Sequence, residues 1–70
     1  MAKDFVITKD GRIAFRRDEF KLMTKEDPSM FNSNYELVLW TTSYPTGRIT
    51  RFDTKIARDE VAKEILEQLD

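Results

Sequence analysis

The run at residues 35–43 constrains the fold more than any other stretch, because it is apolar on both faces of an extended strand. Side chains alternate along a strand, so Leu37 and Leu39 point to one side while Val38 and Trp40 point to the other. No other run in the chain has this property. The stretch is therefore predicted to be a central strand.

Turn signals divide the rest of the first 53 residues into further strands. Asp10-Gly11 favours a tight turn that joins a hairpin. In the second turn Pro45 presets φ, and Gly47 is expected to supply a positive φ. Because this turn is short, the strand after it is expected to pair antiparallel with the central strand. The predicted strands cover about residues 4–8, 12–16, 19–25, 35–43 and 48–52, with a loop at 26–34.

The last part of the chain is predicted to be a helix over about residues 55–69, capped by Thr54 or Asp53. Apolar residues recur there at intervals of three and four, which is typical of an amphipathic helix. The predicted stripe consists of Ile56, Val61, Ala62, Ile65, Leu66 and Leu69. Arg58 is expected on the opposite, polar side.

We therefore predict one α+β domain over residues 1–70, with a four- to five-stranded antiparallel β-sheet and one C-terminal α-helix packed on one face. One helix covers only one face of a sheet. Alternation places on the helix side Phe5, Ile7, Ile13, Phe15, Phe20, Leu22, Leu37 and Leu39. On the opposite face it places Val6, Thr8, Arg12, Ala14, Arg16, Lys21, Met23, Lys25, Glu36, Val38, Trp40 and Thr42.

The second face mixes apolar and basic residues, whereas a solvated sheet face is usually polar throughout. Arg48 or Arg51 is expected to join it, depending on the register of the last strand. Three kinds of partner fit an exposed Trp beside arginines. These are single-stranded nucleic acid, which stacks on aromatics and pairs with cations, a second copy of the chain in a homodimer, and a host protein. The candidate binding residues are Trp40, Arg12, Arg16, Lys21, Lys25, Arg48 and Arg51.

The loop at residues 26–34 offers an alternative explanation for the Trp. Its composition is typical of a turn, and Met30 and Phe31 are expected to fold back onto the core as an anchor rather than contact a ligand. If the loop covers Trp40, the presence of a Trp on the second face is explained without a binding partner.

The element order resembles that of the single-strand-binding transcriptional coactivators of the positive-cofactor type, which dimerise and bind unpaired DNA through a basic, aromatic-bearing sheet. The similarity covers the strand order and the amphipathic helix at residues 60–69. The basic run with glycine that the family has after its last turn is reduced here to Gly47-Arg48. The resemblance implies a nucleic-acid-binding module.

Composition argues against catalysis, because the chain has no His and no Cys. Without these residues neither a thiolate metal site nor imidazole chemistry is available, and no cofactor or metal is expected. The charge is uneven: residues 1–58 hold eleven basic and eight acidic residues, and residues 59–70 hold one and five. The absence of cysteine, leader and apolar span predicts a cytoplasmic protein with no membrane contact. The favoured function is single-stranded nucleic-acid binding, and the alternative is a small protein-binding regulator or inhibitor of viral or mobile-element origin.

Overall fold

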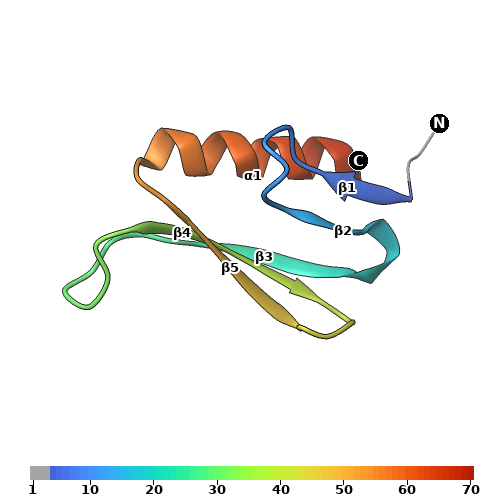
Figure 1. Cartoon of the computed structure of the whole chain (residues 1–70), viewed down its shortest axis with the longest axis horizontal. Coiled ribbons are helices and arrows are strands. Elements are labelled where there is room, and N and C mark those ends of the chain that lie inside the picture. The colour runs from blue at the N-terminus through green and yellow to red at the C-terminus, as the bar shows by residue number, and fades with distance from the viewer. Residues whose placement is uncertain (1–3) are drawn as a thin grey trace.

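The computed structural model describes residues 4–70 as an α+β arrangement of short antiparallel strands followed by one C-terminal helix (Figure 1). The predicted α+β class and the terminal helix are thereby confirmed. In chain order the elements are β1 (Phe5–Ile7), β2 (Ala14–Arg16), the 3-10 turn η1 (Arg17–Glu19), β3 (Phe20–Glu26), β4 (Tyr35–Thr41), β5 (Gly47–Phe52) and α1 (Lys55–Leu69).

The prediction of a single sheet is wrong, because the strands form two sheets. β1 and β2 make a hairpin, and β3, β4 and β5 make a three-stranded sheet with β4 in the middle. The edges of β2 and β5 are joined by arginine side chains instead of backbone hydrogen bonds. Arg48 Nη1 donates to the carbonyl of Ala14 at 2.7 Å, and Arg12 Nη2 donates to that of Arg51 at 2.5 Å. These guanidinium groups occupy the space in which a continuous ladder would form.

The first strand of the N-terminal hairpin has the opposite phase to the predicted one, whereas Ile13 and Phe15 of the second strand are buried as predicted. Val6 and Thr8 are buried, while Phe5 and Ile7 are exposed. Three successive apolar residues carry no alternation, so the sequence does not tell which of them faces the core. Burial of Thr8 is possible because its hydroxyl donates to Asp10 Oδ1 at 2.7 Å and accepts from the Ile13 amide at 3.2 Å. The turn after it is closed as predicted, with Gly11 at φ 75°.

A register shift in β3 moves Leu22, Met23 and Lys25 away from their predicted faces. Phe20 pairs with Thr41 and Leu22 with Trp40, so an extra residue, Lys21, lies between two pairs that are neighbours on β4. Such a bulge reverses the alternation beyond it. Leu22 therefore points away from the helix, and Met23 packs partly against the core.

Helix α1 begins with Thr54 as its cap, whose hydroxyl accepts from the Ala57 amide at 3.2 Å. Its buried residues are Arg58, Ala62 and Ile65. At about 100° per residue these three lie on one line, whereas Ile56 lies on nearly the opposite side and is 72% exposed. Two predicted placements are corrected here, since Ile56 is not in the buried stripe and Arg58 is not on the polar face. Leu66, at the flank of the stripe, is half exposed.

The core lies between α1, the inner face of the three-stranded sheet and the hairpin. The predicted central strand supplies Leu37 and Leu39, both almost fully buried. The buried apolar residues are Val6, Ile13, Phe15, Leu37, Leu39, Phe52, Ala62 and Ile65. Among residues 4–70, no helix is both long and apolar enough to cross a membrane.

Candidate binding surface

The outer face of the three-stranded sheet, which points away from α1, is built from cross-strand rows. Leu22, Trp40 and Gly47 form the first row. Thr24, Val38 and Ile49 form the second, and Glu26, Glu36 and Arg51 form the third. Directly paired residues of an antiparallel sheet point to the same side, so each row presents its side chains together. The face is thus mainly apolar over two rows, with Thr24 as the polar exception, and charged in the third.

Four residues of this face form a continuous apolar patch that we call the outer patch: Leu22, Val38, Trp40 and Ile49. Trp40 is 40% exposed, Leu22 and Ile49 are about half exposed, and Val38 is partly covered by its neighbours. The residues adjoin because Leu22 pairs with Trp40 and Val38 pairs with Ile49. Contiguous exposed apolar side chains of this kind are typical of interaction surfaces.

The position of the indole depends on Gly47. A Cβ atom at Gly47 would lie 2.9 Å from Trp40 Cζ3 and 3.2 Å from Cε3, so the ring lies directly against the glycine backbone. The predicted reason for this glycine is wrong, because only Gly11 among the glycines has a positive φ. Gly47 is needed for close approach of the ring, and it is the first residue of β5 rather than the end of the turn.

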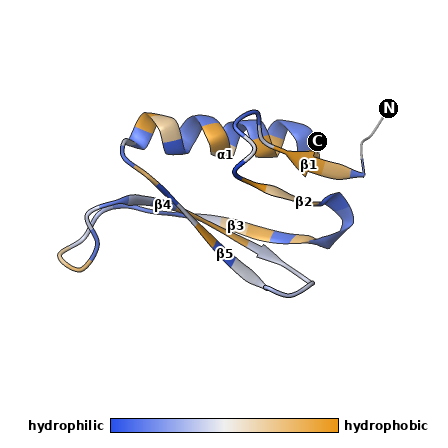
Figure 2. Ribbon diagram, in the orientation of Figure 1, coloured by the Kyte–Doolittle hydropathy of each residue, from blue (hydrophilic) through white to orange (hydrophobic). Residues whose placement is uncertain are grey.

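The loop between β3 and β4 does not cover Trp40. It extends from the opposite end of the sheet, and its tip is hydrophobic (Figures 1 and 2). Met30 and Phe31 at this tip are 90% and 93% exposed, so the prediction that they anchor the loop in the core is wrong. The tip is a tight turn in which Ser29 and Asn32 exchange backbone hydrogen bonds of 2.7 and 3.3 Å. This turn points the two side chains into solvent.

Of the seven residues predicted to form a basic binding face, the structure places only Trp40 and Arg51 among the outer rows. Arg51 Nε donates to Glu36 at 3.2 Å. Lys21 lies exposed at the bulge of β3. Lys25 and Arg48 lie on the inner side of the sheet, because they pair with Leu37 and Leu39 respectively.

The two remaining predicted residues belong to the hairpin. The Arg12 guanidinium lies 4.6 Å from the centre of the Phe52 ring, in addition to its bond with the Arg51 carbonyl. Arg16 on β2 forms two ion pairs, in which its Nε lies 3.4 Å from Asp18 Oδ1 and 3.7 Å from Glu19 Oε1. The predicted basic residues are therefore distributed over several sides of the molecule and are not assembled around Trp40.

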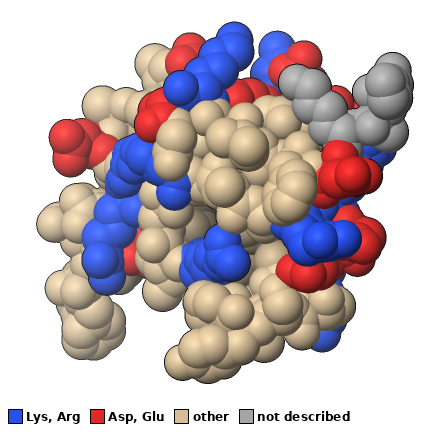
Figure 3. Space-filling model, turned by 45° about the vertical axis from the view of Figure 1, so that its right-hand side comes forward, with Lys and Arg blue, Asp and Glu red and all other residues tan. Residues whose placement is uncertain are grey.

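The space-filling view agrees with this distribution. In Figure 3, Lys and Arg side chains form several separate groups, some of them beside Asp and Glu, with uncharged surface between them. A nucleic-acid groove needs basic side chains that follow a continuous line of phosphates. The basic groups in this view do not join into one stripe across the face.

One basic residue that was predicted to face solvent is instead a structural link. Arg58, 3% exposed, donates from Nη1 to Asp27 Oδ1 at 2.6 Å and to the Glu26 carbonyl at 2.9 Å, and from Nε to Asp59 at 3.0 Å. The hydrogen bond to Asp27 raises the pKa of Arg58 above its ordinary value. Burial raises the pKa of Asp59, but the bond from Arg58 and the charges of nearby cations outweigh burial and lower the pKa overall. The cluster attaches the base of the β3–β4 loop to the start of α1.

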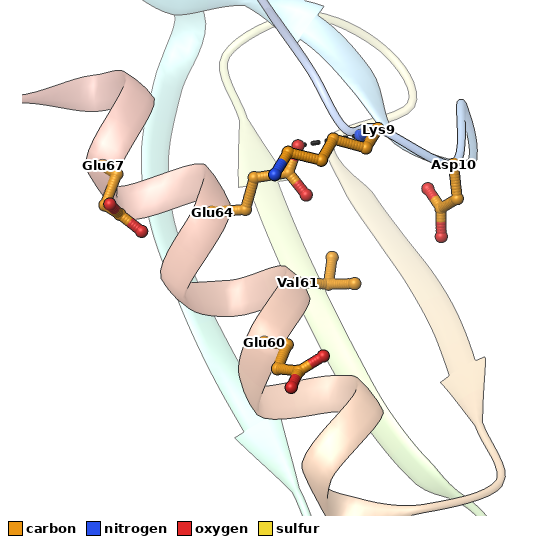
Figure 4. A pocket seen from close by; sticks show the side chains of 6 residues that line it. All are labelled: Lys9, Asp10, Glu60, Val61, Glu64 and Glu67. Carbon is orange, nitrogen blue, oxygen red and sulfur yellow. Dashed lines mark hydrogen bonds between the residues drawn. The ribbon is translucent and has the colours of Figure 1, made fainter.

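A shallow pocket of about 350 Å³ lies between α1 and the hairpin turn (Figure 4). It is lined by Lys9, Asp10, Glu60, Val61, Glu64 and Glu67. Glu64 points to the turn and accepts a hydrogen bond of 2.8 Å from the Lys9 amide, so part of this acidic wall holds the hairpin in place. Within residues 4–70 no group of three or more His, Cys, Asp or Glu side chains is arranged to hold a metal ion.

Two residues of the outer patch were missed by the sequence analysis. Leu22 was assigned to the helix side, because the bulge at Lys21 has no signature in the sequence. Ile49 was not assigned, because the register of the last strand was open. In comparisons with known proteins, no family model, curated protein or solved structure matches this chain.

Proposed function

We propose that the protein is a small non-catalytic binding module that recognises another protein through the outer patch of Leu22, Val38, Trp40 and Ile49. The observation that carries the proposal is the exposure of Leu22, Trp40 and Ile49, which adjoin the partly buried Val38 on one sheet face. Trp is among the residue types that contribute most to protein interfaces, and an apolar centre with a charged margin is typical of their anatomy. Glu26, Glu36 and Arg51 supply such a margin along the third row.

A protein partner is favoured over the single-stranded nucleic acid predicted from the sequence. Stacking on Trp40 alone is compatible with either partner, but phosphates need cations close to the stacking ring. The nearest cross-strand rows hold one arginine, Arg51, and it is paired with Glu36. Two of the other predicted cations, Arg12 and Arg48, donate to the backbone carbonyls of Arg51 and Ala14. These hydrogen bonds join the hairpin to β5.

The proposal of a non-catalytic role rests on the chemistry of the side chains. The sequence lacks His and Cys, the residues that most often act as general bases and covalent nucleophiles near neutral pH. Asp10 has a lowered pKa, because it accepts hydrogen bonds from the Arg12 amide and the Thr8 hydroxyl. A carboxyl held in its ionised form in this way is suited to a turn rather than to proton transfer.

The test is capture of a partner from nuclease-treated lysate of the source cells, with immobilised wild-type protein in high salt. We expect a protein that is retained by wild type and lost, at least tenfold, with Trp40→Ser and with Ile49→Ser. The matched control is Ile56→Ser, which removes an apolar side chain that is even more exposed and lies on the far side of α1. Circular dichroism and thermal unfolding establish that each variant is folded.

Two results would contradict the proposal. Equal retention of the partner by wild type and by the folded Trp40→Ser variant would show that the outer patch is not the contact. Quenching of Trp40 fluorescence by a mixed-sequence single-stranded oligonucleotide, weakening as salt rises, together with loss of all capture after nuclease treatment, would favour nucleic acid instead.

A further inference from the structure

Side chains close the edge of strand β1, which would otherwise be open to pairing. The Gln68 amide of α1 donates to the Ile7 carbonyl at 3.0 Å and accepts from the Ile7 amide at 3.3 Å. Glu64 accepts from the Lys9 amide two residues later. Helix α1 thus supplies the hydrogen bonds that a neighbouring strand would make.

The facing edges of β2 and β5 are closed in the same manner. Arg48 of β5 donates to the Ala14 carbonyl of β2, and Arg12 donates to the Arg51 carbonyl of β5. At three of the four strand edges in residues 4–70, a side chain therefore bonds to at least one backbone group: the Ile7 amide and carbonyl on β1, the Ala14 carbonyl on β2 and the Arg51 carbonyl on β5. Unpaired edges promote association with other chains, and covering them is a common protective device.

Within the described part of the chain, the outer edge of β3 has such a side-chain bond only at its end, which leaves the rest of this seven-residue strand without one. Arg58 donates to the Glu26 carbonyl at its last residue. Between Phe20 and Lys25, no strand pairs with this edge and no side chain of residues 4–70 hydrogen bonds to its backbone. Five of the seven β3 residues are exposed, whereas β4 exposes Trp40 alone. Helix α1 packs mainly on β1, β4 and β5, so it leaves this edge open.

We propose that the outer edge of β3 accepts an extended segment of the partner protein as an additional strand. This inference rests on the proposed function, because the added strand would extend the outer face beside Leu22 and so enlarge the outer patch. Strand addition draws affinity from backbone hydrogen bonds and specificity from alternate side chains. The segment that fits has apolar residues on the side of Leu22 and Trp40.

Charge defines the other side chains of the segment. Lys21 and Lys25 are both exposed along this edge, and Lys25 lies 3.7 Å from Asp59 with about half of its side chain still accessible. Opposite charges directly across a ladder stabilise a strand pair, and like charges destabilise it. The partner segment therefore alternates apolar residues with acidic ones.

The same lysines argue against a second copy of β3 as the occupant. In the antiparallel register centred on Met23, Lys21 of each copy would lie directly opposite Lys25 of the other. Two like-charge pairs would face each other in one short ladder, which is unfavourable. An acidic segment of a different protein would instead be attracted electrostatically to the same two lysines.

The experiment uses a capped seven-residue peptide of alternating Glu and Val as the probe. Its two comparison peptides are a fully N-methylated form, which lacks backbone donors, and a form with Lys in place of Glu. Amide hydrogen exchange of the intact protein is followed by NMR at millimolar peptide. We expect exchange of those amides in residues 22–25 that point away from β4 to slow at least fivefold with the Glu peptide and to change less than twofold with either comparison peptide.

Charge reversal supplies the matched variants. The double variant Lys21→Glu, Lys25→Glu is expected to protect its β3 amides with the Lys peptide instead of the Glu peptide. Lys63→Glu, an exposed helix position, is expected to keep the wild-type preference. Absence of protection in residues 22–25, or equal protection by the N-methylated peptide, would overturn the proposal. If lysate capture still depends on Trp40 in that case, the proposed function stands and only strand addition falls.

Discussion

At the scale of single residues, the hydrogen bonds that Asp10 accepts in its turn are expected to make the stability of the protein depend on pH in acid. Hydrogen bonds from the Arg12 amide and the Thr8 hydroxyl lower its pKa below the ordinary value of 3.8. A carboxyl with a depressed pKa in the folded state stabilises the protein above its unfolded pKa, and this contribution is lost as the pH falls below about 3.8. We expect Asp10→Ala to reduce the unfolding free energy by about 1 kcal/mol at neutral pH.

Urea titrations of wild type and Asp10→Ala at several pH values measure this effect. The difference between the two proteins is expected to shrink steadily from pH 5 towards pH 2. Asp4→Ala, another exposed acid in the same hairpin, serves as the control for general charge effects. A difference that stays constant over this pH range would mean that the Asp10 carboxylate is not responsible.

Arg58 is the second residue whose environment leads to a prediction. Removing one partner of a buried ion pair usually costs about 3 to 5 kcal/mol, because the other partner loses its compensation. Here Asp27 keeps 69% of its side chain in solvent, so we expect a smaller loss of about 2 kcal/mol for Arg58→Ala. Arg58→Lys is expected to recover less than half of it, because a single ammonium does not reproduce the fork of the guanidinium. Chemical denaturation measures both, and a loss no greater than that of Lys63→Ala would contradict the assigned role.

Single residues also differ in how far the sequence predicts their surroundings. Asp10 and Gly11 were correctly identified as turn residues, because the chemistry of a tight turn is local. Arg58 was assigned to solvent, because an arginine in an amphipathic helix usually faces water. Its burial depends on Asp27 and the Glu26 carbonyl, more than 30 residues earlier in the chain. No pattern within the helix contains that information.

At the scale of elements, the close contact between Trp40 of β4 and Gly47 of β5 is expected to make the stability of the protein sensitive to the residue at position 47. A methyl group at Gly47 would lie 2.9 Å from the indole, so Gly47→Ala must displace the ring. Overpacking of this kind typically costs about 1 to 3 kcal/mol, and we expect about 1 kcal/mol because Trp40 is able to move outwards into solvent. The fluorescence maximum of the sole Trp is expected to shift to the red.

A double-mutant cycle provides the control for this prediction. In the Trp40→Val background no ring occupies the space over Gly47, so Gly47→Ala is expected to be nearly neutral. An equal cost in both backgrounds would mean that the glycine serves the backbone conformation and not the packing of the indole.

The elements themselves were largely predictable, but their faces were not. The helix and its Thr54 cap followed from local spacing, and β4 followed from its unusual double-sided apolar run. The phase of β1 was ambiguous, since Phe5, Val6 and Ile7 are all apolar. The bulge at Lys21 reversed the alternation of β3 without any sequence signal. The predicted surface and the outer patch consequently share Trp40 but differ in the side chains that adjoin it.

At the scale of the whole molecule, two sheets were observed instead of one because long-range side-chain contacts replace a backbone ladder. Arg12 and Arg48, which were predicted to bind a ligand, connect the hairpin to β5 in the structure. Sequence reasoning identifies strands more readily than the pairing between distant ones, because pairing is decided by tertiary packing. The remaining open edge at β3 follows from this arrangement.

Lys21 and Lys25 protect that edge against association with other copies, which leads to a prediction for the molecule as a whole. Charged side chains and bulges on an edge strand hinder edge-to-edge pairing, and β3 has both devices. The double variant Lys21→Val, Lys25→Val has an apolar, β-prone edge in place of a charged one. We expect it to form larger species whose average mass rises with protein concentration, while Lys55→Val, Lys63→Val keeps the wild-type behaviour despite the same loss of charge. Sedimentation velocity over a hundredfold range of concentration measures this difference. If both double variants sediment like wild type, Lys21 and Lys25 do not protect the edge against association between copies. The bulge alone then provides that protection, and the two lysines serve only to bind the partner segment.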